Sequence, residues 1–175
     1  MSRMVSWLQV REQRMFHFIN RRLQHAALDR LLGGITHLGG ATATILSALS
    51  ILIFGTSGWR TVGLECTASL VIGFIPVAVI KRKYPRLRPY LVIPDTNTGK
   101  SLLTDHSFPS GHTTAIFSLI MPIVLYLPPL GSLLLPIAFL VGVSRIYLGL
   151  HYPSDVIAGA FLGTLAAVTS VAFIG

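Results

Sequence analysis

The chain has 175 residues, of which 52% are hydrophobic and 11% are charged, and its formal net charge is +8. A soluble domain has about 25% charged residues. Together with a mean hydropathy of +0.68, this composition excludes an ordinary soluble enzyme, a disordered polar segment and a disulfide-stapled secreted miniprotein. The sequence predicts one membrane-embedded domain covering residues 1–175, in which the single cysteine, Cys66, fills part of the core.

The first predicted element is an amphipathic helix within residues 1–30. Apolar residues recur there at helical spacing, and arginines occupy the other positions. This pattern is typical of a helix that lies in the membrane interface. A basic tail that only solvates the terminus is the alternative.

The remaining residues, 31–175, predict an all-α, polytopic transmembrane helix bundle of about five spans. About 20 apolar helical residues cross the hydrocarbon core of a bilayer, and runs near that length with at most one charge recur along the chain. These runs are 31–54, 61–80, 113–144 and 156–175. The run 113–144 is too long for one crossing and is interrupted by Pro128, Pro129 and Gly131, so it predicts a helical hairpin.

Five spans place thirteen of the fourteen basic residues on one side of the membrane and Arg60 alone on the other. The positive-inside rule therefore favours a cytoplasmic position for the basic side. The same side collects most of the groups capable of acid, base or nucleophilic chemistry. These are His106, His112, His151, Asp95, Asp105 and Asp155. We expect the function to reside there.

The first polar motif, residues 81–89, directly follows the run 61–80 and reads KRKYPRLRP. One interpretation is a basic patch that touches anionic lipid headgroups. The other is a phosphate site. Lys81 would be held at a helix end and Arg88 would be fixed by the following Pro89, so that an ammonium and a planar guanidinium converge on the same anion.

The second motif, Pro109-Ser110-Gly111-His112, precedes the run 113–144. Ser110 is suited to capping that helix, and Gly111 lets the chain turn into it. The same geometry favours an anion, because free N–H groups and the positive end of the helix dipole point outward there. His112 is then either a plain surface histidine or a titratable group beside a phosphate.

The third motif, residues 144–155, lies before the last predicted span. Pro153 suits a first helical turn, which brings the carboxylate of Asp155 back toward His151. A carboxylate that accepts the Nδ1–H of a histidine fixes its tautomer and leaves the Nε2 lone pair free for attack. Helix capping by Asp155 is the alternative.

In chain order the motifs are Lys-x6-Arg-Pro, Pro-Ser-Gly-His and Ser-Arg-x5-His-x3-Asp, and with them the chain resembles the type 2 phosphatidic acid phosphatase superfamily. The resemblance implies a lipid phosphate phosphatase that forms a phosphohistidine and needs neither a metal nor a cofactor. It implies that His151 is the nucleophile, that Asp155 orients it and that His112 is the general acid. The residues implied to hold the phosphoryl oxygens are Lys81, Arg88, Ser110, Gly111 and Arg145.

Two alternatives remain open at this point. A metal-dependent route through His106, His112, His151 and Asp155 is conceivable, although two-metal phosphatases usually use more carboxylates than three aspartates. The second alternative is a non-catalytic protein that binds lipid headgroups or transports lipids, because such a protein would also need basic side chains to hold a phosphate.

The expected partners are the bilayer and a lipid phosphate, with no nucleic acid and no protein partner. The resemblance offers phosphatidylglycerophosphate, phosphatidic acid and undecaprenyl pyrophosphate as substrates. Bacterial membrane members of the superfamily typically have six spans and a catalytic face outside the cytoplasm, opposite to the side that the charge count favours.

Overall fold

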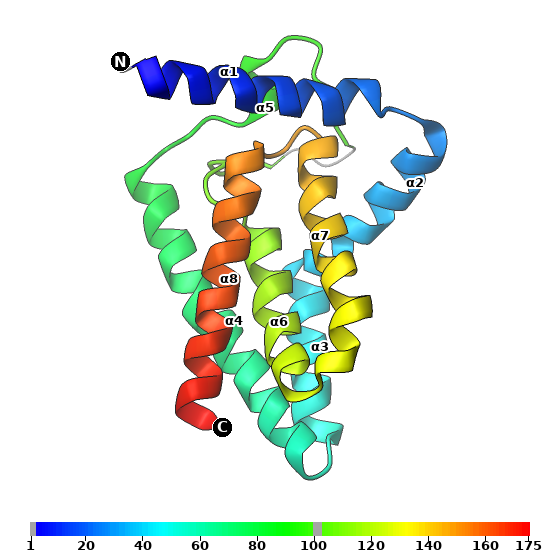
Figure 1. Cartoon of the computed structure of the whole chain (residues 1–175), viewed down its shortest axis with the longest axis vertical. Coiled ribbons are helices and arrows are strands. Elements are labelled where there is room, and N and C mark those ends of the chain that lie inside the picture. The colour runs from blue at the N-terminus through cyan, green and yellow to red at the C-terminus, as the bar shows by residue number, and fades with distance from the viewer. Residues whose placement is uncertain (1–2, 100–102) are drawn as a thin grey trace.

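The computed structural model describes residues 3–99 and 103–175, and within these ranges the chain forms helices and connecting segments without a strand (Figure 1). The elements are α1 (Arg3–His17), a π-helical turn (Phe18–Arg22), α2 (Ala26–Ile35), a 3-10 turn (Thr36–Gly39), α3 (Ala41–Phe54), α4 (Gly58–Lys83), α5 (Pro89–Val92), α6 (Gly111–Tyr126), a 3-10 turn (Pro128–Leu130), α7 (Gly131–Tyr147) and α8 (Pro153–Ile174). The long helices run along the molecule, and α1 lies across one end of them (Figure 1). The predicted all-α membrane bundle is therefore confirmed.

The N-terminal amphipathic helix is packed on the bundle rather than extended as a free tail. Phe16, a residue of α1, is fully buried in a cluster with Ile93, Ile146 and Tyr152. The apolar side chains of the first 18 residues that stay exposed include Trp7, Leu8, Val10, Met15 and Phe18. One side of this segment thus faces the protein, and the other presents the apolar surface expected of an interfacial helix.

The first predicted span is not one straight helix. The helical segment begins at Ala26, five residues before residue 31, where the side chain of His25 accepts a hydrogen bond from the N–H of Ala27 (3.2 Å). It then breaks, and Ala26–Gly39 is bent by 54° from Ala41–Phe54.

Close packing explains where the break falls. A Cβ atom on Gly39 would lie 2.8 Å from the carbonyl oxygen of His112 and 2.7 Å from a methyl group of Val141. Only glycine fits at that distance, so the 3-10 turn can approach the start of α6. The absence of charged residues from the run 31–54 does not reveal this break, because the break depends on packing against α6 and α7.

The other predicted spans are present as α4, the α6–α7 hairpin and α8, but their number is not confirmed as five. Among the described residues, three helices are long and apolar enough to cross a membrane, or four if the bent pair is one span. The helix that falls short is α6, which has 16 residues and is buried over 113–120. It lies among α3, α4, α7 and α8 (Figure 1).

Small and branched side chains form the core around α6. One cluster joins α3, α4 and α6 through Ala48, Val62, Cys66, Leu70, Ala115 and Leu119. Another joins α6 and α7 through Ile116, Phe117, Ile120, Ala138 and Val141. The predicted place of Cys66 in the core is thereby confirmed.

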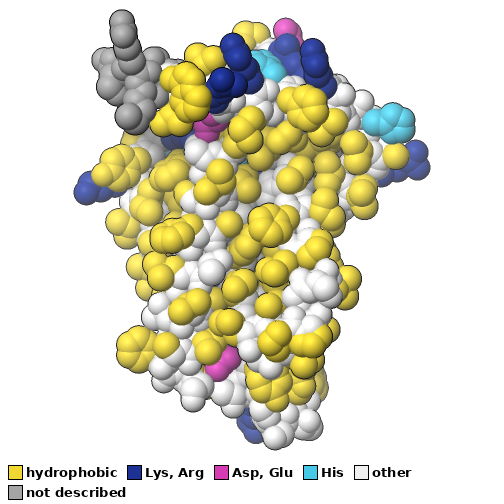
Figure 2. All heavy atoms as spheres, viewed as in Figure 1, with side chains coloured by type: hydrophobic (Ala, Val, Ile, Leu, Met, Phe, Trp, Pro, Cys, Tyr) yellow, Lys and Arg dark blue, Asp and Glu magenta, His cyan; other side chains and the backbone are white. Residues whose placement is uncertain are grey.

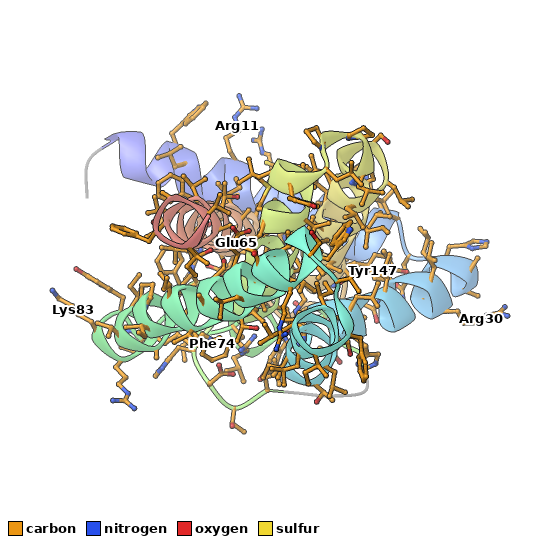
Figure 3. The ribbon with its side chains drawn as sticks, turned by 90° about the horizontal axis from the view of Figure 1, so that it is seen from below. Arg11, Arg30, Glu65, Phe74, Lys83 and Tyr147 are labelled. Carbon is orange, nitrogen blue, oxygen red and sulfur yellow. The ribbon has the colours of Figure 1, made fainter. Side chains whose placement is uncertain are left out.

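The surface has two distinct parts. Hydrophobic side chains cover most of the flank of the bundle, whereas Lys, Arg and His gather mainly at the end that carries α1 (Figure 2). Seen along the bundle, Arg30 and Lys83 project outward and Tyr147 lies inside (Figure 3). We call the end beneath α1, which contains residues 81–89, 105–112 and 144–155, the polar end.

Candidate active site

The three sequence motifs meet at the polar end because each lies where a helix begins or ends. Lys81 is in the last turn of α4, and Arg88 directly precedes α5. Ser110 caps α6, Arg145 is in the last turn of α7, and residues 151–155 lead into α8. Polar side chains up to 74 positions apart in the sequence, from Lys81 to Asp155, therefore lie at one end of the bundle.

Arg88 contacts His151 directly. The Arg88 side chain is 1% exposed, and its Nη1 lies 3.1 Å from Nε2 of His151 and donates to the carbonyl oxygen of Leu150 (2.8 Å). Because a guanidinium can only donate hydrogen bonds, Nε2 must be the acceptor. The imidazole is therefore neutral, with its proton on Nδ1.

The Nδ1 atom of His151 faces Asp155 at 3.5 Å from Oδ2, which is longer than a normal hydrogen bond. Asp155 is fully buried and has two closer partners: Oδ2 accepts from the N–H of Tyr152 (2.8 Å) and Oδ1 accepts from Nη1 of Arg86 (2.7 Å). Asp155 thus caps α8 and also stands behind the histidine, so both sequence interpretations describe part of the geometry.

Burial sets the charge state of His151. Desolvation of the imidazolium lowers the pKa of His151 to about 4; Asp155 opposes this shift, and the charges of Arg145 and Arg88 reinforce it. The ring is accordingly neutral at physiological pH, as attack through a nitrogen lone pair requires.

Lys81 and Arg88 share one counter-ion, Asp105. The Nζ atom of Lys81 lies 2.5 Å from Oδ2 of Asp105 and 2.8 Å from the carbonyl oxygen of His106. Nη2 of Arg88 donates to Oδ1 of Asp105 at 2.6 Å. Although burial raises the pKa of Asp105, its bonds to Lys81 and Arg88 lower the value to about 2. The Asp105 carboxylate therefore binds Lys81 and Arg88, the two cations that the sequence predicts to bind a phosphate.

Arg145 lines a cavity and has two side-chain nitrogens without a hydrogen-bond partner among the described residues. Its Nη1 donates to Oγ1 of Thr36 (2.8 Å), while Nε and Nη2 are buried and lack a partner among the described residues. The cavity measures about 550 Å³ and is lined by Arg145, His112, His37 and Leu150, together with residues of α2. Buried donors without acceptors are costly, so this site favours an anion.

The start of α6 forms another wall of the site. The Oγ atom of Ser110 accepts hydrogen bonds from the N–H (3.4 Å) and the hydroxyl (2.9 Å) of Thr113. The backbone N–H of Ser110 donates to the carbonyl oxygen of Asp155 (3.0 Å). A Cβ atom on Gly111 would meet nothing within 4 Å, so open space lies beside the first turn. His112 follows directly and lines the cavity.

Sequence reasoning missed several residues of this arrangement. The sequence shows Asp105 only as one of three aspartates on the polar side, and it shows Arg86 only as part of a basic patch. Thr36 gave no signal, because its contact with Arg145 joins residues 109 positions apart. Glu12 did give a signal in the sequence, because it is the only acidic residue in positions 1–28.

The alternative of a metal site finds no ligand cluster in the structure. Within residues 3–99 and 103–175, no group of three His, Cys, Asp or Glu side chains is arranged to hold a metal ion. His106, His112, His151 and Asp155 therefore do not form such a group. The chemistry that the polar end offers is that of two histidines among buried and half-buried cations.

Two proteins with known names are similar to this chain in sequence. The "Bacitracin transport permease protein BcrC" of Bacillus licheniformis is 35% identical over 124 residues, which cover 69% of this chain and 61% of that protein. The "Undecaprenyl-diphosphatase" of Sulfolobus acidocaldarius is 33% identical over 158 residues, which cover 90% of this chain and 75% of that protein. The chain thus spans less than two thirds of the first relative and three quarters of the second.

Two solved structures share the fold. Aquifex aeolicus LpxE superposes with a TM-score of 0.83 at 25% identity, over 91% of this chain and 94% of that one. A transmembrane PAP2 type phosphatidylglycerolphosphate phosphatase from Bacillus subtilis superposes with a TM-score of 0.77 at 26% identity, over 95% and 85%. The profile of the PAP2 superfamily matches residues 62–175, which include all three motifs. The chain therefore belongs to the PAP2 superfamily and is a multi-pass membrane protein.

Proposed function

We propose that the protein removes the terminal phosphate of a membrane lipid phosphate or diphosphate through a phosphohistidine on His151. One observation carries this proposal: the neutral Nε2 of His151 lies 3.1 Å from a buried arginine, and the preceding residue, Leu150, lines a cavity together with Arg145 and His112. Phosphoryl transfer needs in-line positioning and cations on the equatorial oxygens more than it needs covalent help. The arginines and Lys81 at the polar end are suited to supply these cations.

In the first step, Nε2 of His151 attacks phosphorus, and the bond from phosphorus to the leaving oxygen breaks. His112 donates a proton to that oxygen, so the lipid leaves as an alcohol or as a monophosphate. Asp155 stabilises the positive charge that the attack places on the imidazole. Arg88, which now donates to Nε2, transfers that donor to a phosphoryl oxygen.

In the second step, water attacks the phosphohistidine, and the bond between phosphorus and Nε2 breaks. His112, neutral after the first step, takes the proton from the water. Inorganic phosphate is released, and both histidines return to their starting states. Lys81, Arg145 and the N–H groups at the start of α6, from Gly111 onward, hold the phosphoryl oxygens in both steps.

The cavity supports a charged leaving group. Arg30 and His37 line the same cavity as His112, on the side from which the general acid acts. The leaving group of a lipid diphosphate is a phosphate monoester and would find these cationic or protonatable groups there. The relative named as an undecaprenyl-diphosphatase also supports a polyprenyl diphosphate as the substrate.

Phosphate release by purified protein tests the function. We expect release from a panel that includes phosphatidic acid, phosphatidylglycerophosphate and undecaprenyl pyrophosphate, fastest with the diphosphate. His151→Ala should lower kcat by at least about 1,000-fold while the helical circular dichroism stays unchanged. Equal release by the two proteins would instead support the rival function, lipid-headgroup binding or transport.

Two further measurements bear on the mechanism. Label from a ³²P-labelled substrate should be trapped on the protein in an acid-labile, base-stable form, and this label should be absent from His151→Ala. Activity should persist in excess chelator, because every cation assigned here is a side chain. Loss of activity in chelator that added Mg²⁺ restores would favour the metal route.

The side of the membrane that carries the site can be decided by thiol labelling. The distribution of basic residues favours the cytoplasm, and the family precedent favours the outside. Asp95 at the polar end and Thr56 at the opposite end are both exposed, while native Cys66 is buried. With a membrane-impermeant maleimide on intact cells, labelling of Thr56→Cys but not Asp95→Cys places the site inside, and the reverse result places it outside.

A further inference from the structure

The side chain of Glu12 connects the N-terminal helix α1 to polar groups behind the candidate active site. Its Oε2 accepts a hydrogen bond from Nη2 of Arg86 at 2.7 Å. Its Oε1 accepts from the N–H of Ser154 at 3.0 Å and also from the Ser154 hydroxyl. The Glu12 side chain is only 16% exposed. An acidic group on an otherwise basic helix is thus buried against the first turn of α8.

Arg86 lies between two carboxylates. While Nη2 bonds to Glu12, Nη1 bonds to Oδ1 of Asp155 (2.7 Å) and to Oγ of Ser154 (2.8 Å). The guanidinium also stacks over the ring of Tyr152, with Cζ 3.9 Å from the centroid. Hydrogen bonds therefore run from Glu12 through Arg86 to Asp155, whose Oδ2 lies 3.5 Å from Nδ1 of His151.

Other contacts hold the N-terminal segment in place on the C-terminal side of Glu12. Phe16 is fully buried, and its ring centroid lies 5.9 Å from that of Tyr152. Asn20, also fully buried, donates to the carbonyl oxygens of Asn97 (2.7 Å) and Tyr147 (2.8 Å) and accepts from the N–H of Asn97 (3.0 Å). The segment is thus fixed by groups other than Glu12, which leaves the Glu12 carboxylate available for a separate role.

We propose that Glu12 is a positioning residue for the nucleophile, acting through Arg86 on Asp155, and that α1 is therefore part of the working enzyme. Glu12 neutralises one side of the Arg86 guanidinium. If that charge were removed, Arg86 would draw on Asp155 as its sole counter-ion, and the carboxylate would turn from His151. This inference rests on the proposed function, in which Asp155 stabilises the imidazolium that forms on attack.

The test compares Glu12→Gln with Asp95→Asn. Both variants replace a carboxylate at the polar end by an amide of the same shape, but the Asp95 side chain is 89% exposed and its nearest cation, Arg21, is 3.6 Å away. We expect Glu12→Gln to lower kcat about 10-fold with KM nearly unchanged, and Asp95→Asn to leave both parameters as in the wild type. Glu12→Asp, which keeps the charge, should recover part of the lost kcat.

Two outcomes overturn the inference. One is a kcat for Glu12→Gln within twofold of the Asp95→Asn value. The other is a loss that Glu12→Asp does not recover or that appears mainly in KM. The proposed function is judged separately, by the wild type against His151→Ala. If that pair differs while Glu12→Gln and Asp95→Asn do not, only the role of Glu12 fails.

A double-mutant cycle keeps the test decisive if Glu12→Gln is poorly folded. Since Glu12 acts through Arg86, adding Glu12→Gln to Arg86→Gln should change kcat by less than twofold. A further 10-fold loss in the double variant would mean that Glu12 acts by another route. Thermal unfolding of all four proteins in the same detergent shows whether the kcat values compare folded enzymes.

Discussion

Two carboxylates flank the cations of the polar end, and they differ in burial. Asp155 is fully buried and is held by Arg86 and a backbone N–H. Asp105 bonds to Lys81 and Arg88, but its side chain is 55% exposed. A fully buried carboxylate is costly to leave without its partner and maintains a geometry, whereas a carboxylate that is partly exposed can be hydrated when another anion takes its place. The comparison suggests a fixed carboxylate behind the nucleophile and a replaceable one where the phosphate binds.

The largest effect on kcat should come from replacing Asp155, the fixed carboxylate. Asp155→Asn removes the charge that favours the imidazolium of His151 and leaves Arg86 without its buried partner. We expect kcat to fall by about 1,000-fold or more, with retained binding of a non-hydrolysable lipid phosphonate. Steady-state kinetics and a binding titration on the same preparation measure the two quantities. A loss of less than 10-fold would mean that Asp155 serves mainly as a helix cap.

Arg88 connects the two sides, because it bonds to Asp105 and to His151. Lysine keeps the charge but cannot form the planar fork that spans both partners. Arg88→Lys should therefore lower kcat/KM by about 100-fold, in the range found when one preorganised donor is lost. The result that contradicts this is activity within threefold of the wild type, which would leave Arg88 as a point charge.

A smaller effect, a gain in phosphate affinity, is expected from replacing Asp105, the replaceable carboxylate. Asp105→Asn removes the anion that competes with phosphate for Lys81 and Arg88. The inhibition constant of inorganic phosphate should fall by about fivefold, because solvent screens the half-exposed Asp105 carboxylate and limits what its removal can contribute. Asp95→Asn again serves as the control for the lost charge. A weaker phosphate affinity in Asp105→Asn would show that this carboxylate instead holds the two cations in position.

The smallest effect concerns pH. The lowered pKa of His151, about 4, predicts that the acid limb of kcat/KM lies well below the usual histidine range, after correction for ionisation of the substrate. Activity should rise as the pH passes above that limb, because His151 becomes neutral there, and should be lost below it as His151 becomes protonated. Since Asp155 raises the pKa of His151, Asp155→Asn should move the limb to lower pH. Asp105→Asn should leave it in place, and an equal shift in both variants would remove the distinction between the two carboxylates.

Sequence alone identified the residues whose spacing is local. His151 and Asp155 are four residues apart, and Pro153 marks the start of α8, which holds Asp155 in its first turn. Ser110 is followed directly by the helix that it caps. In each case the chemical partner is near in sequence, so a motif records the contact.

The contacts that sequence did not reveal are long-range. Arg86 meets Glu12 from 74 positions away and Asp155 from 69, and no periodicity encodes such a meeting. The break between α2 and α3 was missed for a related reason. Hydropathy recorded that the run 31–54 is apolar, but the bend follows from the close approach of Gly39 to His112 and Val141.

The position of α6 determines from which end of the bundle a substrate can reach His112. The helix begins at Gly111, beneath α1, where the N–H of Ser110 donates to the carbonyl oxygen of Asp155 at the start of α8. Under the proposed function, an amphiphile anchored in the bilayer would bring its phosphorylated headgroup to this end along the membrane surface, whereas a water-soluble phosphate ester would have to be captured from solution.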